Sequence, residues 1–171
     1  MPVRKAWDHA IDLKLDFEPR KAKNILLSPQ EQKEVEEFLN SQLEKGYIWE
    51  SKSPQASAVF CILKKDMKKR MAQDYWHLNS GMVWNNYLLP LISELVDKVG
   101  KAKYFMKFDL CWGYNNVWIK EGDEWKAAFT THWGAFEPLV MYFGLMNSPA
   151  TFQMMMNSIM YNLINEGVVV V

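Results

Sequence analysis

The chain has 171 residues, of which 49% are hydrophobic and 14% aromatic, so it can bury the core of one domain or of part of one. Its 20 basic and 20 acidic side chains cancel, and this balance gives no support for tight autonomous binding to nucleic acid. The two cysteines fit neither a disulfide framework nor a metal site, which needs more ligands at closer spacing, and the three histidines are scattered. With no signal peptide and no membrane-spanning apolar run, the sequence favours an intracellular chain, without separating cytoplasm from nucleus.

The first clear element is a helix that follows residues 1–27, which have mixed charge and are predicted to form an extended lead-in. Ser28 is expected to cap this helix, with Pro29 in its first turn and Glu31 completing a capping box. Gly46 ends it. One apolar face is predicted, formed by Val35, Phe38, Leu39 and Leu43.

A hairpin is predicted next. The β-rich run "AVFCIL" (58–63) is its first strand, "KKDMKKR" (64–70) its tip, and a second strand is expected near Met71 to Tyr75. The segment "LPLISELVDKVGKAK" is predicted to form a short amphipathic helix that ends at Gly100.

The C-terminal part mixes strands and helices. The segment 104–110 is predicted as a strand, 116–132 as a hairpin with the turn "EGDE", and 136–142 as a further strand. A helix is expected to begin at Ser148 and Pro149 and to run to Gly167, before a last strand in "VVVV" (168–171). Because helices and strands do not alternate strictly, the order predicts an α+β fold.

The basic run at the hairpin tip has two interpretations. It packs five cations into seven residues (64–70). Such a cluster is commonly a solvated turn that resists aggregation. Alternatively, it clamps phosphates, with Arg70 as a bidentate fork and the lysines as point charges. The pattern by itself leaves both interpretations open.

Asp109, at the end of the predicted strand 104–110, also has two interpretations. It could cap the following turn. It could also ligate Mg²⁺ in a cleft, a chemistry that requires at least two converging carboxylates. Asp123 and Glu124 lie in the predicted hairpin turn and are poor candidates for the second ligand. Residue spacing does not decide whether Asp109 caps the turn or ligates a metal ion.

The eight tryptophans are a surplus for this length, and several fall where a loop or surface is expected. Trp49, Trp76 and Trp133 are examples. Because exposed tryptophan usually binds something, stacking on nucleic-acid bases is one explanation.

Several blocks in unbroken order across residues 26–171 resemble the reverse transcriptase of Gypsy-class long-terminal-repeat retrotransposons. They include "LSPQEQKEVEEFLNSQLEKGYI", "SKSPQASAVFCILKKD", "KKRMAQDYWHLN", "PLISELVDKVGKAKYFMKFDL", "GYNNVWIKEGDEWKAAFTTH" and "FEPLVMYFGLMNSPATFQ". The resemblance implies a right-hand polymerase fold, of which residues 28–171 would supply the fingers and the N-terminal part of the palm.

The resemblance also implies roles for particular residues. Asp109 matches the first of three catalytic aspartates that bind Mg²⁺, and Tyr114 matches the aromatic gate that excludes a 2′-hydroxyl from the incoming nucleotide. The fingers cations that hold the triphosphate correspond to Lys64 or Lys65 and to Arg70. The segment that shapes the nucleotide and template pocket supplies Phe143, Gly144, Pro149 and Gln153. The implied partners are an RNA or DNA template–primer and deoxynucleotides.

The sequence also departs from the family pattern. The family carries its other two catalytic aspartates in a Tyr-x-Asp-Asp turn after its valine-rich strand, and this sequence reaches Val171 just before that turn. The thumb, connection and RNase H parts, which belong to the remainder of the polyprotein, are not in the sequence either. With one of three metal ligands, the chain is expected not to polymerise by itself.

Substitutions form a second departure. Tryptophan or cysteine stands where the family typically has arginine, methionine where it has threonine, and leucine where it has proline. The positions are Trp49, Trp76, Cys111, Trp118, Trp133, Met106, Met146, Met154 and Leu88. Each change can arise from one C-to-T transition, so a decayed copy of a retroelement is the hypothesis that explains them. An alternative function is a non-catalytic nucleic-acid-binding remnant, and a third is an inert relic that folds poorly.

Overall fold

The computed structural model describes residues 3–63, 69–100, 102–104 and 106–167. Its helices are α1 (Pro29–Glu44), α2 (Trp76–Gly81), α3 (Ile92–Val99), α4 (Ser148–Ile159) and α5 (Tyr161–Asn165), with 3₁₀ turns η1 (Gly113–Asn116) and η2 (Glu124–Ala127). Its strands are β1 (Ile48–Glu50), β2 (Ser57–Leu63), β3 (Lys69–Gln73), β4 (Phe129–Thr131) and β5 (Gly134–Pro138). Within the described residues these strands form one sheet in the order β1-β5-β4-β2-β3.

Helix α1 begins and ends as the sequence predicts. The Ser28 hydroxyl accepts a hydrogen bond from the backbone N–H of Glu31, and the Glu31 carboxylate accepts one from the backbone N–H of Ser28 at 2.8 Å. This capping box satisfies two amide groups that the helix itself leaves unpaired. Val35 and Leu39 are buried, whereas Leu43 is exposed, so the buried face is narrower than predicted.

The predicted hairpin is present. Strands β2 and β3 pair antiparallel, with Val59 opposite Gln73 and Ile62 opposite Arg70. β3 starts at Lys69, two residues earlier than predicted, which places the last two cations of the basic run in a strand. The tip itself, 64–68, lies outside the described residues. On its other side β2 pairs in parallel with β4, which joins the hairpin to the rest of the sheet.

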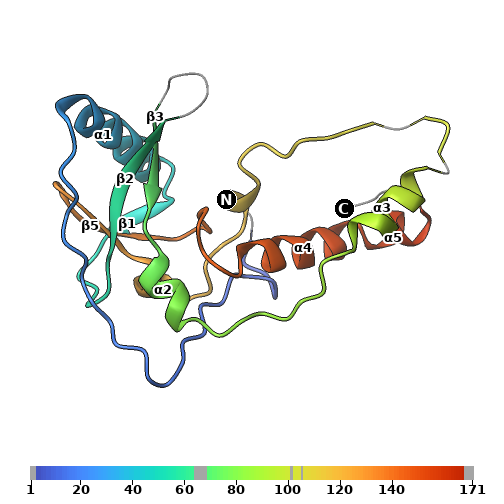
Figure 1. The fold of residues 1–171 in the computed structure, drawn as a ribbon, viewed down its shortest axis with the longest axis horizontal. Coiled ribbons are helices and arrows are strands. Elements are labelled where there is room, and N and C mark those ends of the chain that lie inside the picture. Colours follow the sequence, from blue (N-terminus) through green and yellow to red (C-terminus); the bar gives the residue numbers. More distant parts are fainter. Residues whose placement is uncertain (1–2, 64–68, 101, 105, 168–171) are drawn as a thin grey trace.

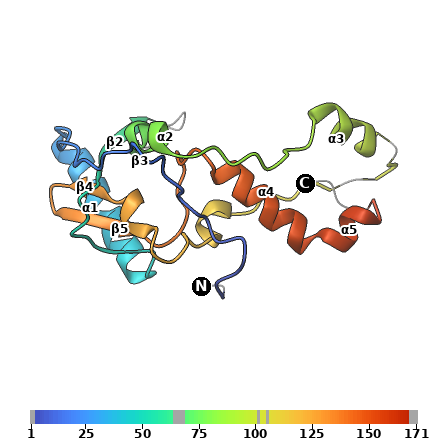
Figure 2. The ribbon, with the colours of Figure 1, turned by 90° about the horizontal axis from the view of Figure 1, so that it is seen from below.

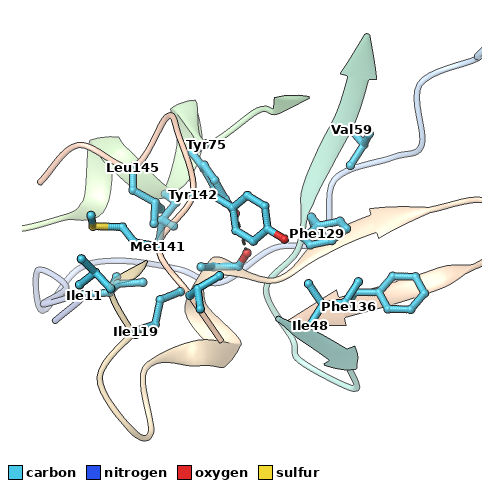
Figure 3. Close-up of a cluster of buried hydrophobic side chains, with 14 of the residues drawn as sticks. Ile11, Ile48, Val59, Tyr75, Ile119, Phe129, Phe136, Met141, Tyr142 and Leu145 are labelled. Carbon is cyan, nitrogen blue, oxygen red and sulfur yellow. Dashed lines mark hydrogen bonds between the residues drawn. The ribbon is translucent and has the colours of Figure 1, made fainter. Parts of the chain in front are cut away.

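The core joins side chains of the sheet, the N-terminal segment, α1 and α4, and Figure 3 shows part of it. Ile11, Ile119, Phe129 and Met141 are fully buried in it. Tyr75, just beyond β3, is also buried and donates a hydrogen bond from its hydroxyl to the carbonyl of Ala127 at 3.0 Å. The predicted lead-in therefore supplies core side chains and is packed against the sheet.

Residues 104 and 106–110, the described part of the predicted strand 104–110, do not form a strand, contrary to the prediction. Residues 106–110 have no regular secondary structure and are exposed. A strand needs a neighbour to complete its hydrogen bonds, and no strand among the described residues lies beside this segment. Alternating apolar residues are therefore insufficient to form a strand here.

The predicted hairpin over 116–132 is also wrong. Ile119 donates its backbone N–H to Leu139, and Met141 donates to Val117, so the segment around Ile119 pairs with the chain beyond β5. Asp123, at the expected turn, instead accepts from the backbone N–H of Ile11 at 2.8 Å. The N-terminal segment thus occupies the edge that a hairpin partner would use.

The C-terminal helix begins at Ser148 with Pro149 in its first turn, as the sequence predicts, but it is not one continuous helix. Asn147 is the N-cap residue of α4. The Ser148 hydroxyl donates a hydrogen bond to the carbonyl of Tyr142 at 3.4 Å. The helix is divided at Met160 into α4 and α5. Together with α3, these helices project away from the sheet (Figures 1 and 2). None of the helices described is long and apolar enough to span a membrane.

Candidate nucleotide site

Four parts of the chain, β3, η1, the turn before α4 and α4 itself, bring an arginine and three aromatic rings into one cluster, called the stack below. The Arg70 guanidinium, on β3, lies 4.4 Å from the centre of the Phe143 ring. The ring centroids of Phe143 and Tyr114 are 4.6 Å apart, and those of Tyr114 and Phe152 are 5.4 Å apart in an edge-on arrangement. Such contacts are favourable for both cation–ring and ring–ring pairs. Three of the predicted site residues, Arg70, Tyr114 and Phe143, are thereby neighbours.

Two glycines allow these elements to approach one another. A Cβ on Gly113 would lie 3.1 Å from the Phe152 ring, which is tighter than ordinary contact. Gly144 has φ +99, a conformation that side-chain-bearing residues rarely adopt, and its backbone passes close to the Tyr75 ring. The predicted pocket residue Gly144 therefore sets the turn that presents Phe143.

The stack is open on one side. Phe143 and Arg70 are exposed, whereas Tyr114 is half-buried. This partial burial raises the pKa of the Tyr114 hydroxyl, because the phenolate form would lose solvation. The neutral phenol is the form present at physiological pH, and its ring can serve as an uncharged surface for a ligand.

A second group of contacts anchors β3 behind the stack. Lys69 forms an ion pair with Glu31 at 3.0 Å, which joins the start of α1 to the start of β3. Hydrogen bonds from the Ser28 backbone and hydroxyl, together with the Lys69 interaction, lower the pKa of Glu31 to about 2. Lys69 is thus occupied by a structural contact, and Arg70 is the cation of the described part of the run that faces the rings.

Asp109 is exposed at the end of the extended segment 106–110. Among the described residues, its carboxylate makes no hydrogen bond that would cap the following turn. In that part of the chain no group of three or more Asp, Glu, His or Cys side chains could hold a metal ion. Asp123 and Glu124 are engaged elsewhere, in contacts with Lys126 and Arg4 respectively.

The other predicted site residues are placed around the start of α4. Pro149 lies in its first turn. The Gln153 amide donates to Asn157 at 3.0 Å, and the Asn157 amide donates in turn to the Tyr87 hydroxyl at 2.8 Å. Lys64 and Lys65 lie outside the described residues.

Sequence reasoning missed Phe152 as a member of the stack. It lies inside the block "FGLMNSPATFQ", one residue before Gln153, so its presence in that block was the available signal. Its contact with Tyr114 depends on the placement of α4 against η1, which no local pattern encodes.

The tryptophans that the sequence places at the surface are exposed. The exposed fraction of Trp76 is 85%, and Trp49 and Trp133 are also exposed. The Trp49 indole donates a hydrogen bond to Glu137 across the β1–β5 pair at 2.8 Å. This residue therefore has a structural contact of its own.

Comparison with known proteins identifies the family of the chain. A family model described as "Reverse transcriptase (RNA-dependent DNA polymerase)" matches residues 58–171. The chain belongs to the reverse transcriptase family. The resemblance read from the sequence blocks is confirmed at this level.

The curated relatives are retrotransposon polyproteins. The retrovirus-related Pol polyprotein from transposon 297 of Drosophila melanogaster is 37% identical over 153 residues, which cover 86% of this chain and 14% of the relative. The transposon Tf2-3 polyprotein of Schizosaccharomyces pombe is 38% identical over 138 residues, 81% of this chain and 10% of that protein. The chain thus corresponds to a small part of each polyprotein.

Solved structures confirm the predicted fold class. The protease–reverse transcriptase of prototype foamy virus matches with a TM-score of 0.80 and 22% identity, over 94% of this chain and 21% of that one. A foamy viral protease–reverse transcriptase in complex with an RNA/DNA hybrid matches with a TM-score of 0.77 and 19% identity. The chain therefore has the α+β architecture of part of a reverse transcriptase.

Proposed function

We propose that the chain is the fingers and N-terminal palm of a Gypsy-class retrotransposon reverse transcriptase, and that its aromatic stack receives the incoming nucleotide. The observation that carries the proposal is the convergence of Arg70, Phe143 and Tyr114 from β3, the turn before α4, and η1. A triphosphate requires a cation, and a deoxyribose requires a flat apolar surface. The stack offers both side by side.

In this proposal each residue has a distinct role. Arg70 leaves the Phe143 ring and donates to phosphate oxygens, since a guanidinium presents several N–H groups in a fixed fork. Tyr114 packs against the sugar and leaves no room for a 2′-hydroxyl, which favours deoxynucleotides over ribonucleotides. Phe152 supports Tyr114 from behind. Lys64 or Lys65 adds charge for the triphosphate.

Reverse transcriptases generally use divalent metal ions, and Mg²⁺ is the ion that we propose for this one. Asp109 is the proposed ligand from this chain. The described residues do not by themselves fit a metal site, because among them no group of three or more Asp, Glu, His or Cys side chains could hold a metal ion. A carboxylate pair is the minimum for metal-assisted phosphoryl transfer. We therefore expect no primer extension by the 171-residue chain alone.

Nucleotide binding tests the proposal without requiring catalysis. The affinity of the chain for a deoxynucleoside triphosphate, measured by calorimetry, is expected to fall roughly 10- to 100-fold in Arg70→Met, because charge-assisted hydrogen bonds are lost. Tyr114→Ala is expected to narrow the difference between deoxy- and ribonucleotides, while Tyr114→Phe preserves it. Equal affinity of the wild type for both sugars, unchanged by Tyr114→Ala, would rule out the gate.

A non-catalytic nucleic-acid-binding remnant is the second candidate function. The exposed Trp76 and Phe143 are the observations that favour it, because exposed rings are available to stack on unpaired bases. It predicts template–primer binding that weakens with salt and with neutralisation of Lys64, Lys65 and Arg70. Binding that is absent or independent of salt would remove this candidate.

A further inference from the structure

His9, in the N-terminal segment, connects two elements whose rings meet in the stack. Its backbone N–H donates to the carbonyl of Trp118 at 2.7 Å, and its carbonyl accepts from the backbone N–H of Lys120 at 2.9 Å. Its Nδ1 lies 2.8 Å from the hydroxyl of Thr151, in the first turn of α4. The main chain of His9 is therefore bonded to the segment that follows η1, and its side chain is bonded to α4.

Both bonded positions lie close in sequence to rings of the stack. Trp118 lies just beyond η1, which carries Tyr114, and Thr151 directly precedes Phe152. The centroids of the Tyr114 and Phe152 rings are 5.4 Å apart. Because a Cβ on Gly113 would lie only 3.1 Å from the Phe152 ring, η1 and α4 are already in tight contact here. A small displacement of α4 would therefore change how Phe152 packs against Tyr114.

The N-terminal segment is held on both sides of His9. Before it, the Arg4 guanidinium donates to the Glu124 carboxylate at 3.1 Å. After it, the Asp123 carboxylate accepts from the backbone N–H of Ile11 at 2.8 Å. Because these contacts hold the backbone of the segment, the imidazole of His9 has a fixed position from which it binds α4.

The chemistry of His9 suits a residue that fixes a position. The side chain is fully buried, yet its Nε2 has no hydrogen-bond partner among the described residues. A buried polar atom without a partner costs free energy that an apolar side chain of similar size would avoid. The imidazole supplies in return a hydrogen bond to Thr151, which is also buried. Because a hydrogen bond is directional and apolar contacts are not, this bond fixes the position of α4 on the N-terminal segment.

We propose that His9 is a positioning residue for the nucleotide site. By bonding residues 118–120 with its main chain and Thr151 with its side chain, it fixes α4 against η1 and so holds Phe152 against the Tyr114 ring. His9 is fully buried and does not touch the nucleotide. Its effect on the choice between deoxy- and ribonucleotides rests on the proposed function of Tyr114.

Two changes at Thr151, made in the 171-residue chain, test the proposal. Thr151→Val keeps the shape of the side chain but removes the hydroxyl. It is expected to lower the ratio of deoxy- to ribonucleotide affinity, measured by calorimetry, on the order of fivefold, because one buried hydrogen bond is lost. Thr151→Ser keeps the hydroxyl and is expected to retain the wild-type ratio.

Thr130→Val is the matched control. The Thr130 hydroxyl, on β4, also bonds the N-terminal segment, where it donates to the Asn24 side chain at 3.0 Å. This contact does not involve α4 or η1. The same chemical change at Thr130 is therefore expected to leave the affinity ratio unchanged.

His9→Leu removes the same hydrogen bond from its other side. The double variant of His9→Leu with Thr151→Val is therefore expected to have the same affinity ratio as either single variant, whereas two unrelated structural effects would add. Since either single variant removes the bond, each tests the proposal where the other fails to fold.

Fluorine NMR of the chain labelled with 3-fluorotyrosine reports the Tyr114 ring without any nucleotide. Its resonance is assigned by its loss in Tyr114→Phe, and it is expected to shift in Thr151→Val but not in Thr151→Ser or Thr130→Val. A resonance unaffected by Thr151→Val, an unchanged affinity ratio in a chain that does discriminate, or additive effects in the double variant would each overturn the proposal. A wild type that binds both sugars equally would instead refute the proposed gate, and the fluorine resonance alone would then decide whether His9 positions Tyr114.

Discussion

Acidification is expected to destabilise the fold through His9. This side chain is fully buried, its Nδ1 lies 2.8 Å from the Thr151 hydroxyl, and its Nε2 has no hydrogen-bond partner among the described residues. Burial lowers its pKa from 6.5 to about 4, although the nearby Asp123 carboxylate opposes this shift. The imidazolium form would bury a second N–H without an acceptor, so the folded state favours the neutral imidazole.

The sign and size of the effect follow from these values. Because the unfolded chain takes up the proton near pH 6.5 and the folded chain only near pH 4, stability is complete above about 6.5 and falls as the pH decreases between these values. At about pH 5 the expected loss in the free energy of unfolding from His9 is about 2 kcal/mol relative to neutral pH. That is a substantial part of the stability of a small domain.

Denaturant unfolding followed by tryptophan fluorescence measures this loss. His9→Gln retains an amide that can contact Thr151 but does not titrate. Between neutral pH and about pH 5, its free energy of unfolding is therefore expected to fall by about 2 kcal/mol less than that of the wild type. His132→Gln, at an exposed position, is the matched control and keeps the wild-type pH dependence. An identical pH dependence in the wild type and in His9→Gln would refute the reasoning.

Three further substitutions test the local structure by thermal or denaturant unfolding. Ser28→Ala removes the cap of α1 and is expected to cost about 1 kcal/mol, whereas an increase in stability would contradict the capping box. Trp112 has φ 56, a left-handed conformation that glycine adopts without strain. Trp112→Gly is therefore expected to be about 1 kcal/mol more stable than Trp112→Ala. Phe129→Ala, in the core, is expected to lower the free energy of unfolding by about 3–5 kcal/mol, whereas Leu88→Ala, at an exposed position, is expected to lower it by less than about 0.5 kcal/mol. Similar losses in the two variants would disprove the placement of the core.

The elements that the sequence predicted correctly are those with local signals. The capping box at Ser28 and Glu31 and the end of α3 at Gly100 depend on residues within a few positions of one another. The pairing of β2 with β3 is also local, because a hairpin joins neighbours in the chain. These patterns are decided by backbone geometry and short-range hydrogen bonds.

The predictions that failed concern pairing between distant segments. Residues 106–110 alternate like a strand but have no strand neighbour among the described residues, and the segment around Ile119 pairs with the chain near Leu139 because the N-terminal segment occupies its other side. A residue pattern states which faces are apolar, but it does not state which strand covers them. The break of the last helix at Met160 was likewise not indicated by the sequence.

The sequence by itself determined the family, the helix α1 and the β2–β3 hairpin, because long blocks of residues and short-range capping and turn signals are carried in the chain directly. It also singled out Arg70, Tyr114 and Phe143 as site residues. Only the tertiary structure decided that these three stack on one another, that Phe152 supports them, and that His9 is buried while Asp109 is exposed. These features depend on contacts across many tens of residues, and packing sets them rather than local propensity.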